Sequence, residues 1–93
     1  MVMKHVTGTV DRGKVVLYAL STCIWCKKTR QFLENAGIVY DYEYVDLADP
    51  KRADEIEKTI EDVFGHVSYP SLIAPDGKVQ GYRPEEIKAL LQI

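Results

Sequence analysis

The feature that most constrains this 93-residue chain is the stretch STCIWCKK, residues 21–28, which holds both of its cysteines. It directly follows VVLYAL, residues 15–20, a continuous apolar run of strand length. After it, apolar and small side chains recur at helical spacing as far as Gly37, a residue typical of a helix C-terminal cap. The sequence therefore predicts a central strand that leads through the cysteines into a helix over 24–36.

Local signals predict the remaining elements as well. Alternating tyrosines and acids over 39–47 indicate a strand with one face in the core. Asp49 as N-cap, Pro50 in the first turn and Gly65 at the end bound an amphipathic helix. Two short strands, YPSLIA and VQGY, flank the turn PDGK, which favours antiparallel pairing, and RPEEIKALLQI predicts a last helix that starts at Pro84. The predicted order is strand, helix, strand, helix, strand, strand, helix.

The chain has the length of one small domain, and its composition, 46% hydrophobic and 28% charged, is that of an ordinary globular protein. We assign residues 15–93 to this domain and residues 1–14 to an N-terminal extension. The extension contains HVTGTV and the turn DRGK, so it either adds an edge strand or stays mobile. We expect a monomer.

Charge and segment composition exclude several classes of function. The formal net charge of −2 argues against a nucleic-acid surface. The first residues do not have the pattern of a leader peptide, and no apolar stretch approaches membrane-spanning length, so we expect a cytoplasmic protein without a membrane partner. Two cysteines are too few for a secreted disulfide scaffold; in a reducing compartment such a pair is more often catalytic or metal-binding.

The position of the cysteines predicts their chemistry. Cys23 falls at the helix N-terminus, where unpaired N–H groups and the helix dipole favour an anion such as a thiolate. The dipole contributes only about 0.3 to 1 kcal/mol, so hydrogen bonds, helped by Lys27 and Lys28, must supply most of the stabilisation. Cys26 lies one turn further on the same face. We therefore expect Cys23 to be the exposed catalytic nucleophile and Cys26 the buried resolving thiol.

The cysteine pair also has four alternative roles. A structural disulfide across so short a loop would stabilise little. Zinc needs four ligands, and His5 and His66 have no recognisable metal spacing from the cysteines, so we assign no metal residue. A [2Fe-2S] cluster shared between two chains would need only the pair from each. A redox-inert adaptor that holds a peptide is the fourth.

The chain resembles the glutaredoxin family of the thioredoxin fold over roughly residues 14–93. The resemblance lies in the CxxC pair after the first strand, in SYPSLI and in GYRPEEI. It implies an α/β, thioredoxin-like fold with a four-stranded mixed sheet flanked by helices. It also implies that Pro70 is a cis-proline beside the cysteines and that Gly81 lies close to bound substrate. The residues expected to contact substrate are Thr22, Trp25, Tyr69, Pro70, Gly81 and Tyr82.

The sequence departs from the family pattern at three places, and the last two concern the electron donor. Ile24 stands where the family usually has a proline, and Trp25 keeps the aromatic residue that follows it. Ser21 and Thr22 stand where glutathione-using members carry a basic residue. GYRPEE replaces a glycine pair and aspartate and looks like the segment of redoxins that take electrons from thioredoxin reductase and serve ribonucleotide reductase. We expect an oxidoreductase of disulfide-containing proteins without a required cofactor. Its reductant is glutathione or thioredoxin reductase, with a preference against glutathione.

Overall fold

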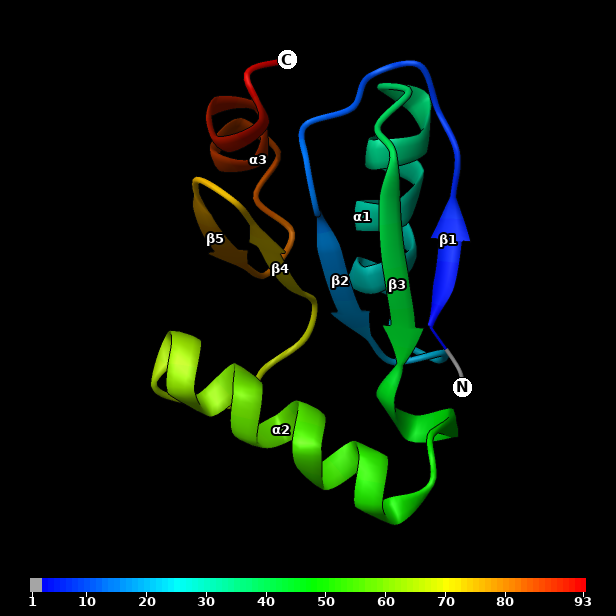
Figure 1. Ribbon diagram of the computed structural model, residues 1–93, viewed down its shortest axis with the longest axis vertical. Helices are drawn as coiled ribbons and strands as arrows, with labels where there is room; N and C mark the ends of the chain where they lie inside the picture. Colours follow the sequence, from blue (N-terminus) through cyan, green and yellow to red (C-terminus); the bar gives the residue numbers. More distant parts are fainter. Residues whose placement is uncertain (1–2) are drawn as a thin grey trace.

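The central strand carries apolar side chains on both faces, so both faces of the sheet need cover. The computed structural model describes residues 3–93. In strand β2, Val16–Ala19, the side chains of Leu17 and Ala19 enter one hydrophobic cluster and that of Tyr18 packs against another. Helices α1, Ile24–Asn35, and α3, Pro84–Leu91, cover the first face, and helix α2, Pro50–Phe64, covers the second. Figure 1 shows α1 behind β3 and α2 running across the lower end of the sheet.

The sheet of residues 3–93 is mixed and has the strand order β1-β3-β2-β4-β5 (Figure 1). Strand β2 pairs in parallel with β3, and the other neighbours are antiparallel. The strands that flank β2 are β1, Lys4–Val6; β3, Tyr40–Tyr44; β4, Ser71–Ala74; and β5, Gly77–Gln80. The predicted thioredoxin-like α/β fold is confirmed, and the extension adds β1 as a fifth strand at the edge.

The predicted helix boundaries follow from their caps. Asp49 accepts a hydrogen bond from the N–H of Arg52 at 2.9 Å, and Pro50 begins α2. Gly65 ends the helix in the left-handed conformation, φ 87°, which a glycine adopts without steric cost. None of the helices in residues 3–93 has the length and apolarity to span a lipid bilayer.

Three predicted strands have different bounds in the structure: two are shorter and one is shifted along the chain. The strand expected over 39–47 ends at Tyr44 and passes into a short 3₁₀ helix, η1, Val45–Leu47. The strand expected over 69–74 begins only at Ser71, because Pro70 has no N–H for a ladder bond. The strand expected over 79–82 starts at Gly77 and ends at Gln80, since Gly81 has a φ of 90° and turns the chain.

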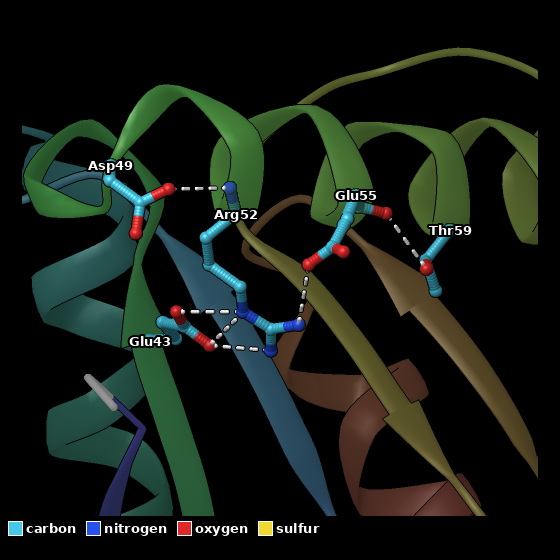
Figure 2. Close-up of polar contacts among 5 residues, drawn as sticks. All are labelled: Glu43, Asp49, Arg52, Glu55 and Thr59. Atoms are coloured by element: carbon cyan, nitrogen blue, oxygen red, sulfur yellow. Dashed lines mark hydrogen bonds and ion pairs between the residues drawn. The ribbon is translucent and has the colours of Figure 1, made fainter.

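The expectation that one face of β3 lies outside the core is wrong for Glu43. Its side chain is 0% exposed, because α2 covers this face of the sheet. Arg52 of α2 donates hydrogen bonds to the Glu43 carboxylate from Nε and Nη2, the shorter at 2.8 Å (Figure 2). The buried charge is thus paired, and the pair links the sheet to α2.

Candidate active site

Cys23 is the N-cap of α1 and the last residue of a tight turn. Its N–H donates to the carbonyl of Leu20 at 3.2 Å, which closes the turn Leu20–Cys23 between β2 and α1. Its Sγ accepts a hydrogen bond from the N–H of Cys26 at 3.2 Å. Cys23 is partly exposed, and its thiol is unbridged. A thiolate at this position receives a backbone hydrogen bond and lies at the positive end of the helix.

Cys26 lies one helical turn inside the protein and has 0% exposed surface. Its thiol is free. Burial, followed by the hydrogen bond with Cys23, raises the pKa of the Cys26 thiol to about 12. The predicted arrangement of a reachable Cys23 and a shielded Cys26 is therefore the one in the structure, and the two thiols differ in environment although they share one helix turn.

Trp25, Gly81 and Tyr82, three of the predicted substrate contacts, lie together. The rings of Trp25 and Tyr82 stack with their centroids 6.0 Å apart and their planes 20° apart. With Gly81 and Arg83 they line an open hollow of about 330 Å³. Trp25 remains 54% exposed, so its ring is available to a partner although it already has one aromatic neighbour.

Tyr69 and Pro70 connect to the same region. The peptide bond between them is cis, as the resemblance implies, and the Pro70 carbonyl accepts a hydrogen bond from the N–H of Gly81 at 2.8 Å. Pro70 is buried and Tyr69 partly buried. Burial, with the negative charge of Glu57, raises the pKa of the Tyr69 phenol to about 12. Tyr69 therefore stays neutral and presents backbone and a phenol at this end of the sheet.

Thr22, the sixth predicted contact, is exposed in the turn directly before Cys23. No hydrogen bond of its side chain is found among residues 3–93. Its position makes it accessible to a partner of Cys23. Within the same residues, no group of three or more histidine, cysteine or acidic side chains is arranged to hold a metal ion.

One residue of this region was not singled out from the sequence. Asp46 of η1 accepts hydrogen bonds from the N–H of Ser21 at 2.9 Å and from its Oγ–H at 2.5 Å. These bonds, the hydroxyl one foremost, lower the pKa of the Asp46 carboxyl. The available signal was the parallel order of the strands: Ser21 follows one strand and Asp46 the next, and such strands end at the same edge of a sheet.

Comparison with known proteins places this geometry among redox proteins. The family model described as glutaredoxin matches residues 15–79. Among solved structures, a glutaredoxin from Methanosarcina mazei Go1 is 38% identical, with a TM-score of 0.91 over 100% of this chain and 90% of the other. Methanoredoxin from Methanosarcina acetivorans is 34% identical, with a TM-score of 0.87 over 92% and 90%.

A third solved structure is more distant. NrdH-redoxin from Escherichia coli, described as a glutaredoxin-like protein with a thioredoxin-like activity profile, is 27% identical, with a TM-score of 0.67 over 84% of this chain and 95% of the other. A comparison of the sequence with curated proteins finds no match. The matches cover most or all of the chain, so the likeness concerns the whole domain.

Proposed function

Because this chain belongs to the glutaredoxin family, we propose that it is a thiol-disulfide oxidoreductase that reduces protein disulfides through Cys23 and Cys26. One observation carries the proposal: the Sγ of Cys23 accepts the Cys26 N–H at 3.2 Å at the start of α1, while Cys26 is fully buried behind it. A partner disulfide can reach only the first sulfur.

The exchange takes place in two steps. In the first, the Cys23 thiolate attacks one sulfur of a substrate disulfide, forms a mixed disulfide and releases the other substrate sulfur as a thiolate. In the second, Cys26 loses its proton to solvent and attacks the Sγ of Cys23. The bond between Cys23 and substrate breaks, the second substrate thiolate leaves, and a Cys23–Cys26 disulfide remains. Two electrons have passed from the protein to the substrate.

The residues around Cys23 offer a seat for an extended substrate segment. The backbone of Tyr69, directly before Pro70, supplies N–H and C=O groups of the kind that pair with an added strand. Trp25 and Tyr82 provide an aromatic surface beside the hollow at Gly81. Thr22 directly precedes Cys23 in the chain, whereas Trp25 follows it. These roles extend the resemblance to individual positions of this sequence.

For the electron donor, we propose a thioredoxin-reductase type of flavoenzyme in preference to glutathione. Ser21 and Thr22 provide no cation directly before Cys23, and Glu85 and Glu86 place negative charge in the first turn of α3, after Gly81. Glutathione carries two carboxylates, which find no cation directly before Cys23, and the nearby Arg83 and Lys88 are already paired with Glu86 and Glu85 at 3.6 and 3.5 Å. The likeness to NrdH-redoxin, whose activity profile is described as thioredoxin-like, supports the same choice.

Single cysteine variants test the proposed roles. The variant Cys23→Ser should lose all turnover. Cys26→Ser should retain the first step and accumulate a mixed disulfide with substrate, visible as a mass increase that dithiothreitol reverses. Equal loss in both variants without a trapped species would refute the assignment. The donor is tested separately by supplying the oxidised protein with either glutathione and its reductase or thioredoxin reductase, each with NADPH; faster reduction by glutathione would contradict the proposed donor.

A further inference from the structure

The turn that carries Cys23 depends on one carboxylate from another part of the chain. Ser21 is a central residue of the turn Leu20–Cys23, and it donates both its N–H and its Oγ–H to Asp46, at 2.9 and 2.5 Å. Among residues 3–93, no other side chain accepts a hydrogen bond from this turn. The position of the nucleophile is thus linked to η1.

The fold itself delivers Asp46 to this place. Strands β2 and β3 run in parallel with Ala19 opposite Tyr44. Two residues further along each chain stand Ser21 and Asp46, so continuing the register brings the two side by side (the strand ends lie at the lower edge of the sheet in Figure 1). The contact therefore follows from strand pairing and does not depend on a chance surface rotamer.

Both cysteines are joined to the same turn. Cys23 is its last residue, and the N–H of Cys26 donates a hydrogen bond to the Sγ of Cys23 at 3.2 Å. In the second step, the Cys26 sulfur must attack along the line of the bond that breaks. A buried thiol is rarely ionised at neutral pH, so the rate of this step depends on alignment, for which effective molarities reach about 10⁵ M or more.

We propose that Asp46 is a positioning residue for the second step: its carboxylate holds the turn Leu20–Cys23 so that the two sulfurs stay aligned for attack. This inference rests on the proposed function, because it concerns the closing half of the same exchange. Asp46 itself touches neither substrate nor the reacting sulfurs and acts through Ser21.

The two steps can be timed separately with dithiobis-nitrobenzoate, an aromatic disulfide whose released thiolate is coloured. Equimolar reagent releases one thiolate when Cys23 attacks and a second when Cys26 closes the disulfide. In Asp46→Ala, we expect the second phase to slow by about tenfold to a hundredfold, while the first stays within about threefold of wild type. Equal second phases in the two proteins would overturn the role of Asp46. Absence of a second phase in the wild type would instead overturn the proposed function.

A second variant separates position from charge. Asp46→Asn keeps a carbonyl acceptor for the Ser21 N–H but removes the negative charge, which is one of the smaller causes that raise the pKa of Cys26. If Asp46 acts by positioning, the rate at which this variant closes its disulfide should be within about threefold of the wild-type rate. A second phase as slow as that of the alanine variant would contradict the proposal, because it would show that the negative charge of Asp46, and not its hydrogen-bond acceptor, determines the rate of closure.

Two matched controls complete the comparison. Ser21→Ala loses the Oγ–H bond and keeps the backbone bond, so its second phase should fall between those of wild type and Asp46→Ala. Asp62→Ala removes an exposed carboxylate of α2 and should leave both phases unchanged. Thermal unfolding of each variant reports on the fold, and because the result is the ratio of two phases in one protein, a general loss of stability does not imitate it.

Discussion

At the scale of single residues, burial separates two thiols that stand three positions apart. Cys23 is partly exposed and receives a hydrogen bond from the backbone of α1, whereas Cys26 has 0% exposed surface. Because a charge is poorly solvated in an apolar interior, burial raises the pKa of Cys26, to about 12. The thiolate of Cys26 is therefore scarce at neutral pH and becomes more abundant as the pH rises.

The pH dependence of Cys26 follows from this shift. In the variant Cys23→Ser, we expect the alkylation rate of Cys26 by iodoacetamide to rise about tenfold per pH unit over roughly pH 7 to 10, since the whole range lies below the raised pKa. Burial, the largest cause of the shift, is retained in this variant. Peptide mass spectrometry measures the rate. A plateau beginning near the value of a free thiol, about 8.5, would show that the interior does not oppose the charge.

Trp25 gives a second prediction at this scale. Replacing it with alanine removes a stacked, half-exposed ring beside the hollow at Gly81. An aromatic contact contributes about 0.5 to 1.5 kcal/mol, so we expect KM for a synthetic peptide disulfide to rise about twofold to tenfold, with kcat nearly unchanged. Ile24→Ala, at an equally exposed neighbour, is the control. An unchanged KM in the Trp25 variant would remove Trp25 from the substrate surface.

At the scale of elements, the ion pair between Glu43 and Arg52 fastens α2 to the sheet. Figure 2 shows the Arg52 side chain reaching down from α2 to the Glu43 carboxylate on β3, while the N–H of Arg52 donates to the capping carboxylate of Asp49. The carboxylate is 0% and the arginine side chain 35% exposed. Removing Arg52 would leave a buried charge without a partner, which is far more costly than the loss of a surface ion pair.

Urea denaturation tests this pair. Breaking a fully buried pair costs about 3 to 5 kcal/mol; with one partner a third exposed, we expect Arg52→Met to lower the free energy of unfolding by about 2 kcal/mol after allowing for solvent screening. The double variant Glu43→Leu with Arg52→Met should recover much of the loss. Glu55→Ala, which removes only the exposed partner of Arg52, should change stability by at most about 0.5 kcal/mol. A single variant as stable as this control would contradict the linkage.

The elements differ in how well the sequence predicts them, for physical reasons. Helix α2 was predicted to its ends because Asp49, Pro50 and Gly65 are local signals that need no distant partner. Strand β1 stayed one of two alternatives, since an edge strand exists only through its pairing with β3. Burial of Glu43 depends on Arg52 in another element, and so an alternating pattern alone assigned it to the wrong side.

The same distinction holds for the site. The cysteines, the cis bond before Pro70 and the neighbours Trp25, Gly81 and Tyr82 were found from motifs that lie close together in the sequence. Asp46 was missed because its partner is 25 residues away and its role depends on the register of two strands. Motifs thus identified the cysteine pair, whereas strand pairing determines which side chain contacts the turn before it.

At the scale of the whole molecule, the extension and the last helix close the domain together. Arg12 donates from Nε to the carbonyl of Leu91 at 2.8 Å and from Nη2 to that of Gln92 at 3.3 Å. These carbonyls belong to the end of α3, where helix C-termini lack intrahelical donors and attract cations. Residues near the two ends of the chain are thereby joined.

Thermal unfolding tests this closure. Arg12→Ala removes both bonds, of which one is part-buried and one exposed. We expect a loss of about 1 kcal/mol, which for a domain of this size lowers Tm by about 4 to 8 °C. Lys14→Ala, an exposed cation of the same segment, is the control and should leave Tm unchanged. If the two variants melted alike, the arginine contact would have no part in holding the ends.

The central claim is that the reduced protein presents one reactive thiol, that of Cys23, while the thiol of Cys26 is buried and reacts only in the second step. Brief labelling of the reduced wild-type protein with limiting iodoacetamide at neutral pH, followed by peptide mass spectrometry, measures this directly. The account predicts that nearly all of the label is on Cys23 and that Cys26 is alkylated far more slowly at this pH. Comparable labelling of both cysteines in the folded protein, or earlier labelling of Cys26, would contradict it.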